Sequence, residues 1–82
     1  DIEFPAISVQ VVYPGTAPED VNEQITTKLE NSFKSIEGVK TLSSSSFESV
    51  SVINLEFPFN TDMDKVEQQI NSTLKEAGLP EN

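Results

Sequence analysis

The stretch Tyr13-Pro14-Gly15-Thr16-Ala17-Pro18-Glu19-Asp20-Val21 decides how this chain folds, because it converts a strand into a helix within a few residues. Pro14 lacks the N–H that a strand ladder requires, and Gly15 accepts the backbone angles of a sharp turn. Thr16 and Glu19 have the T-x-x-E spacing of a capping box at a helix start. We therefore expect one strand to end and one helix to begin inside this stretch.

Upstream of that turn, side chains alternate in character over residues 5–13, and a period of two predicts a strand. Ala6 and Val12 make one of its two faces less polar than a solvated face usually is, which favours a contact on that side. The face expected to meet the core carries Ile7, Val9, Val11 and Tyr13, and the other carries Ala6, Ser8, Gln10 and Val12.

Downstream of the turn, the pattern predicts a helix over residues 17–37. Pro18 suits its first turn, where the missing N–H leaves no bond unmade, and Gly38 suits the left-handed position after its last turn. Steps of four, four, four and three residues place the apolar positions on one stripe; these are Val21, Ile25, Leu29, Phe33 and Ile36.

The second half of the chain predicts a short strand over residues 39–43, a strand over 50–57 and a helix over 62–77. The serine-rich segment 43–49 is expected to be a polar connection, most simply a hairpin, and Leu42 is the best core candidate before it. Thr61 or Asp62 would cap the last helix, and Gly78 would end it. The faces of the 50–57 strand carry Ile53, Leu55 and Phe57 on one side and Val50, Val52, Asn54 and Glu56 on the other.

The order β-α-β-β-α predicts an α+β fold, a ferredoxin-like split β-α-β without its final strand. A right-handed crossover makes the first two strands parallel and puts the third, antiparallel, between them. Both helices then cover one face of an antiparallel sheet, and the edge of the first strand stays open for pairing with another chain. The bare face would carry Ser8, Gln10, Val12, Val52, Asn54 and Glu56.

Composition limits the chemistry. Fourteen acidic residues against five lysines give a net charge of −9, which argues against binding to nucleic acid or to anionic lipid headgroups. The chain has no His and no Cys, so the commonest general base, thiolate and transition-metal ligand are missing. We expect no enzyme activity, no cofactor and no metal site.

Three candidate sites fail on spacing or residue type. The serines of segment 43–49 have no base nearby in sequence to activate one of them. Asp62 and Asp64 lack a third cation ligand at a suitable spacing and suit a helix start instead. An acylphosphatase-like enzyme on the same fold needs an arginine phosphate cradle, and the chain has no arginine.

The role of Phe47 stays open from the residues alone. Phe47 either closes the hairpin against the first helix or projects outward to a ligand or partner. The chain begins with Asp1 and has its only methionine at Met63, so we expect a fragment of a longer protein. No run of eighteen apolar residues is present to span a membrane.

The segment from Ile7 to Glu30, with the Tyr-Pro-Gly strand end and the Val/Ile/Leu helix stripe, resembles the porter region of resistance-nodulation-division (RND) efflux transporters. The resemblance continues through residues 36–39, 42–46 (the Ser-rich strand), 51–57, 60–62 and 79–80, and so covers nearly the whole chain. It implies that residues 1–82 form the first porter subdomain, just after the first transmembrane helix, on the extracytoplasmic or periplasmic side of the bacterial inner membrane.

In that family, porter subdomains enclose substrate pockets, and carboxylates and a lysine in the membrane helices carry the protons. The resemblance thus implies a proton-driven multidrug exporter of amphiphilic small molecules, a homotrimer whose other porter subdomains and membrane domain are this segment's partners. Carried over by position, the substrate-binding candidates are Ser8, Gln10, Val52 and Asn54; Val52 stands where a polar residue is common. A different class of function is a stand-alone ferredoxin-like interaction module that pairs through the edge of its first strand.

Overall fold

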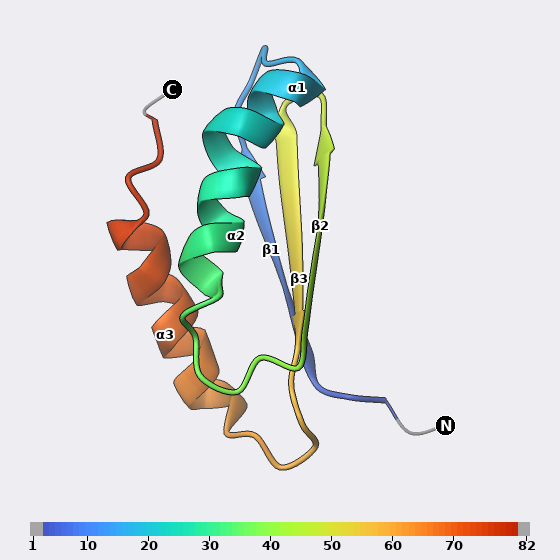
Figure 1. Cartoon of the computed structure of the whole chain (residues 1–82), viewed down its shortest axis with the longest axis vertical. Helices are drawn as coiled ribbons and strands as arrows, with labels where there is room; N and C mark the ends of the chain where they lie inside the picture. The colour runs from blue at the N-terminus through green and yellow to red at the C-terminus, as the bar shows by residue number, and fades with distance from the viewer. Residues whose placement is uncertain (1–2, 81–82) are drawn as a thin grey trace.

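The computed structural model of this chain describes residues 3–80, so the outer limits of the predicted 1–82 unit lie outside the described residues. The segments α1, η1 and α2 follow one another without a break as one helical run, in which η1 is a turn of π-helix. Figure 1 shows the helices in one layer and the strands in a second. The elements are β1 (Ala6–Val12), α1 (Pro18–Val21), η1 (Asn22–Thr26), α2 (Thr27–Phe33), β2 (Thr41–Phe47), β3 (Val50–Glu56) and α3 (Met63–Glu76).

The sheet has the strand order β1-β3-β2, and β3 pairs antiparallel with both neighbours. β1 and β2 are therefore parallel to each other and are joined by the helical run. Both the helical run and α3 pack on the same side of the sheet (Figure 1). The predicted α+β fold is confirmed, and the strand order is compatible with the ferredoxin-like arrangement.

The core lies between the sheet and the two helical segments. Phe33 on α2 and Phe57 after β3 are the largest side chains with no exposure. The predicted stripe on the first helix is confirmed, because all its members are buried. The core residues are Val9, Ile25, Leu29, Phe33, Ile36, Ile53, Leu55, Phe57, Val66 and Ile70.

The π-helical turn explains how a stripe with four-residue spacing stays on one side. In an ideal α-helix, 3.6 residues make a turn, so each four-residue step drifts by about 40° around the axis. A π turn closes its hydrogen bond one residue later and holds more residues, so it rotates the stripe back. Val21 just before η1, Ile25 within it and Leu29 in α2 are accordingly all at most 1% exposed.

The ends of the helices match the sequence rules at three points and depart from them at two. Pro18 occupies the first helical position, Asp62 caps α3 by accepting a hydrogen bond from the Lys65 N–H, and Gly78, which follows the C-cap of α3, has a positive φ of 68°. The expected capping box is wrong: Ala17 is the N-cap and makes no side-chain cap bond. Thr16 instead directs its hydroxyl to the Pro14 carbonyl, at 3.4 Å.

The first helix also ends earlier than predicted, at Phe33 instead of residue 37. The backbone tightens there, because the Ser35 N–H bonds to the Ser32 carbonyl and the Ile36 N–H to the Phe33 carbonyl. The Ser35 hydroxyl adds a 2.7 Å bond to the same Ser32 carbonyl. A side chain that bonds local carbonyls competes with the regular helical pattern, which accounts for the early end.

The largest departure from the sequence prediction is β2. The predicted strand 39–43 and polar connection 43–49 are wrong, because β2 runs from Thr41 to Phe47 and includes the serine run. Only Glu48 and Ser49 separate the paired residues Phe47 and Val50. β3 supplies a full ladder to β2, and this pairing overrides the low strand preference suggested by composition.

Candidate functional site

One face of the sheet is left uncovered by the helices, and we call it the open face. Its side chains form four rows across the three strands, because directly opposed residues point to the same side. The rows are Val12, Val50 and Phe47; Gln10, Val52 and Ser45; Ser8, Asn54 and Ser43; and Ala6, Glu56 and Thr41.

The four residues predicted to contact substrate lie together on the open face. Ser8 is directly opposite Asn54, and Gln10 is directly opposite Val52. They occupy the second and third rows on the neighbouring strands β1 and β3. Ser8, Gln10 and Asn54 are exposed, and Val52, on the central strand, is half-buried. The arrangement presents two hydrogen-bonding amides and a hydroxyl beside an aliphatic group.

β2 contributes residues that the sequence argument missed. Ser45 completes the second row, Ser43 the third, and Phe47 the first. Of the two alternatives for Phe47, the structure supports the outward one, since the side chain is 55% exposed on the open face. A uniform serine run gives no apolar alternation, so the only usable signal was the two-residue separation of Phe47 and Val50.

The other serines of the run face the first helix and make specific bonds there. The Ser44 hydroxyl donates to a Glu30 carboxylate oxygen at 2.6 Å. Ser46 bonds to the Thr26 hydroxyl at 2.8 Å and to the Asn22 side-chain oxygen at 3.3 Å. These serines attach the helical run to β2, so they are not nucleophile candidates.

A buried hydroxyl group extends this attachment to the central strand. Thr26 and Ser51 are at most 1% exposed, and their hydroxyl oxygens are 2.7 Å apart. Thr26 therefore bridges β2 and β3 from the π-helical turn. Burying a hydroxyl is tolerable because each one here has a partner. We call Asn22, Thr26, Ser46 and Ser51 the hydroxyl cluster.

Ser49 fixes the hairpin turn at the first-row end of the open face. Its φ of 64° lies in the left-handed region, which is uncommon for a residue with a side chain. Its N–H donates to the Thr16 carbonyl, its carbonyl accepts from the Tyr13 N–H, and its hydroxyl accepts from the Gly15 N–H, at 2.8, 2.7 and 2.9 Å. The turn that follows β1 thus holds the β2–β3 turn at three points.

The opposite end of the sheet carries an aromatic cluster. Phe4 and Phe59 stack with ring centroids 4.3 Å apart, and Lys40 Nζ lies 4.1 Å from the Phe4 centroid. These residues come just before β1, just after β3 and just before β2, so they mark the end beyond the fourth row. The stack ties the first described segment to the loop after β3.

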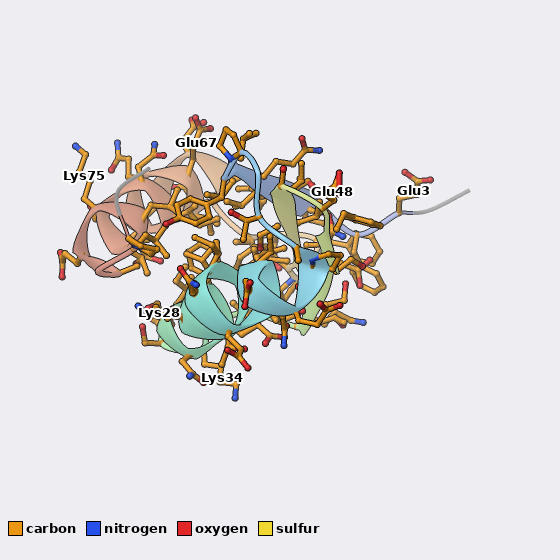
Figure 2. All side chains as sticks on the ribbon, turned by 90° about the horizontal axis from the view of Figure 1, so that it is seen from above. Glu3, Lys28, Lys34, Glu48, Glu67 and Lys75 are labelled. Atoms are coloured by element: carbon orange, nitrogen blue, oxygen red, sulfur yellow. The ribbon has the colours of Figure 1, made fainter. Side chains whose placement is uncertain are left out.

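Charges lie mostly around the edge of the molecule. Figure 2 shows Lys28, Lys34 and Lys75 projecting outward from the helices, whereas Glu48 lies beside the sheet. Among the rows of the open face, the only ionisable side chain is Glu56, in the fourth row. The centre of the open face is therefore uncharged in a chain with a net charge of −9.

The described residues form a hollow on the helix side of the sheet but no group of metal ligands. Within residues 3–80, no three His, Cys, Asp or Glu side chains come together as a metal site. Asp62 is used as a helix cap. A shallow hollow of about 430 Å³ lies on the helix side, between the segment after α2 and α3, and is lined by Ser35, Ile36, Lys65, Gln68, Gln69, Ser72 and Thr73.

Comparison with known proteins assigns the chain to a family. The model of the AcrB/AcrD/AcrF family matches residues 1–82. This chain belongs to that family of RND transporters. The resemblance noted in the sequence is thereby confirmed, and family membership points to a transporter and not to an enzyme.

A curated relative supports the same assignment. The Swarming motility protein SwrC of Bacillus subtilis (strain 168) is 28% identical over 82 residues, which are 100% of this chain and 8% of that protein. The chain thus spans a small part of the relative's length. RND transporters reside in the inner membrane, and among the described residues of this family member no helix is long and apolar enough to cross a membrane.

Proposed function

We propose that this chain is the first porter subdomain of a proton-driven RND exporter and that its open face forms one wall of a pocket for amphiphilic small molecules. One observation supports this most strongly: the four residues carried over by family position lie in two adjacent rows on the face that the helices leave uncovered. Amide and hydroxyl groups beside an aliphatic side chain suit a ligand with polar and apolar parts.

The remaining parts of the parent would complete the site. A flat sheet face does not enclose a ligand, and binding pockets bury most of their ligand's surface. A second wall must therefore come from the other porter subdomains, in a parent that assembles as a homotrimer. The coupling protons would be carried by the membrane domain, and this subdomain would lie on the extracytoplasmic side.

The core supports motion of the subdomain as one rigid unit. Phe33 on α2 and Phe57 after β3 belong to a single cluster that also includes Ile70 of α3. The hydroxyl cluster adds directional bonds between the first helix and both β2 and β3. Packed interiors transmit displacement with little internal change, so the open face would move with its helices when the transporter changes state.

The test uses the full-length parent transporter in a host that lacks its other exporters. Gln10→Trp and Asn54→Trp place bulk on the open face, and Gln24→Trp and Asn31→Trp are matched controls at exposed helical positions. We expect the first pair, and not the second, to change accumulation of several amphiphilic substrates at equal protein level. Unchanged export across a broad substrate panel would overturn the proposal.

A second candidate function rests on the strand order. β1 is an edge strand, so no described strand of this chain pairs with the N–H and C=O groups on its outer side. Such an edge can template pairing with another chain, as in a ferredoxin-like interaction module. Size-exclusion chromatography with light scattering tests it: the module should dimerise, and Ser8→Pro should abolish the dimer. A monomer at every concentration contradicts it.

A further inference from the structure

The first row of the open face differs from the rows beside it. Val12, Val50 and Phe47 are all apolar and come from all three strands. Val12 is 63% exposed and Phe47 is 55% exposed. We call these three residues the apolar row. It lies directly beside the second row, which holds the proposed substrate contacts Gln10 and Val52.

The apolar row and the polar rows together match the size of an amphiphile. Alternate residues of a strand are about 7 Å apart, so the first and third rows are separated by about 14 Å. Over that distance, hydrocarbon surface gives way to the amides of Gln10 and Asn54 and to small hydroxyl groups. A ligand lying along the strands would meet both kinds of surface in a fixed order.

The charge of this surface indicates what kind of amphiphile fits. The first three rows contain no ionisable side chain, although the chain carries fourteen acidic residues. Carboxylates occur only at the two ends, Glu48 in the hairpin turn and Glu56 in the fourth row. A bound anion would face repulsion from both ends. The polar rows offer a head group only neutral amide and hydroxyl partners, which replace the water around an uncharged head more fully than the water around a cation. An uncharged polar head is the complementary group.

The apolar row is also held in a defined position. Ser49 follows Phe47 by two residues and precedes Val50, and its three bonds to residues 13–16 fix the turn against the segment that follows Val12. Two members of the row are thus tied to the third through Ser49. A fixed apolar surface loses little freedom when a ligand binds, which favours affinity.

From these observations we propose that the apolar row is a subsite that takes the hydrocarbon part of a neutral amphiphile, whose uncharged polar head bonds to Gln10 and Asn54. The inference rests on the proposed function, because it names the substrate class of the same face. Ser49 acts in it as a positioning residue. Its hydroxyl holds Gly15, and through that contact the Tyr13–Thr16 turn keeps Val12 level with Phe47.

The experiment measures how export depends on chain length. Full-length transporter is expressed in a host without other exporters, and growth inhibition by n-alkyl glucosides from hexyl to decyl is recorded. Burial of hydrocarbon can favour each added methylene by up to about fourfold, so protection by the parent should rise along the series. Val12→Thr, which preserves shape, and Phe47→Ser should flatten that rise, and Ser49→Gly should flatten it partly.

Matched variants show whether a change in chain-length dependence comes from the apolar row or from a general loss of transport. Phe59→Ser removes an aromatic side chain with the same 55% exposure at the opposite end of the sheet, and it should keep the rise. Asn54→Trp should lower protection at every chain length alike. An n-alkyltrimethylammonium series tests the head group, and the row variants should change its chain-length dependence less than that of the glucosides.

Each outcome decides one idea. If Asn54→Trp and Gln10→Trp act but Val12→Thr and Phe47→Ser leave the rise intact, the subsite is refuted and the proposed function stands. If none of the four acts, the proposed function fails. A chain-length effect confined to the ammonium series overturns the neutral head group. If Phe47→Ser lowers the amount of transporter, the isosteric Val12→Thr decides alone.

Discussion

The covered face and the open face of this sheet are built from alternate residues of the same strands, yet they use polar side chains in opposite ways. On the covered face, Ser44, Ser46 and Ser51 each bond to a side chain of the first helix. On the open face, Ser43 and Ser45 are exposed. Serine in a strand therefore does not by itself indicate solvent, because its surroundings are set by which face the pleat assigns it.

The covered face therefore holds the helices on the sheet, whereas the open face is free to bind a ligand. Hydrogen bonds on the covered face are directional, and several of them form one connected group, so they specify the position of the helical run on the sheet as well as adding stability. Polar groups on the open face are exposed and can exchange water for a ligand. Substitutions on the covered face should therefore lower the free energy of unfolding more than matched substitutions on the open face.

The largest difference in stability is expected between two phenylalanines, one on each side of the sheet. Phe57 is fully buried and Phe47 is 55% exposed. Phe57→Ala should lower the free energy of unfolding by about 3–5 kcal/mol, from lost burial and a cavity. Phe47→Ala should cost less than about 1 kcal/mol. A domain of this size is stable by roughly 4–12 kcal/mol, so Phe57→Ala should leave little margin.

Urea unfolding of the 82-residue chain, followed by circular dichroism, measures both losses. Similar losses for the two variants would contradict the assignment of the two faces. A large loss at Phe47 alone would mean that the open face is covered in the folded chain.

Substitutions in the hydroxyl cluster should have the next largest effect on the free energy of unfolding. Thr26→Val keeps the shape of the side chain but leaves the buried Ser51 hydroxyl without its Thr26 partner. An unpaired buried hydroxyl costs about 1–3 kcal/mol. Adding Ser51→Ala removes the orphaned group and should restore most of the loss, and Ser46 still has Asn22 as a partner.

A double-mutant cycle in urea reads this coupling directly. Additive losses from Thr26→Val and Ser51→Ala would show that the bond does not contribute. Ser45→Ala on the open face is the matched control, and its unfolding free energy should change by no more than about 0.5 kcal/mol.

The third largest effect on the free energy of unfolding is expected in the β2–β3 hairpin turn. Ser49 has a φ of 64°, and a β-branched residue in that conformation meets a steric penalty of roughly 1–2 kcal/mol. Ser49→Val should therefore lower the unfolding free energy by about that amount. Ser49→Gly relaxes the backbone while losing one exposed hydrogen bond, so it should change stability by less than about 0.5 kcal/mol. Equal effects of the two variants would show that backbone strain is not the cause.

The sequence was sufficient to predict burial where the spacing of apolar residues within one element showed which face meets the core. The stripe from Val21 to Phe33 and the alternation of Ile53 and Leu55 follow from helical and strand periods, and burial confirms them. Ser8, Gln10, Val52 and Asn54 were correctly placed on one uncovered face for the same reason. Their role in binding is a proposal, which the Gln10→Trp and Asn54→Trp variants test.

The sequence was insufficient where long-range contacts decide. Thr16 fits the capping rule, but the chain instead uses its carbonyl to hold Ser49, thirty-three positions away in sequence. The serine run has no alternation to read, so β2 and the contribution of Phe47 to the open face depend on pairing with β3. Both errors arise because the partner lies on another element.

The smallest predicted contrast lies inside that run and is the strictest test of register. Ser44 and Ser45 have serine neighbours on both sides, so local sequence gives no reason for them to differ. Ser44 donates to Glu30 at 2.6 Å across a half-buried interface, and Ser44→Ala should lower the unfolding free energy by about 0.5–1.5 kcal/mol. Ser45→Ala should be nearly neutral. A shift of one residue in the pairing of β2 with β3 would exchange the faces of every serine. Destabilisation by Ser45→Ala in place of Ser44→Ala would therefore indicate that shift, and it would move Phe47 from the open face to the covered one.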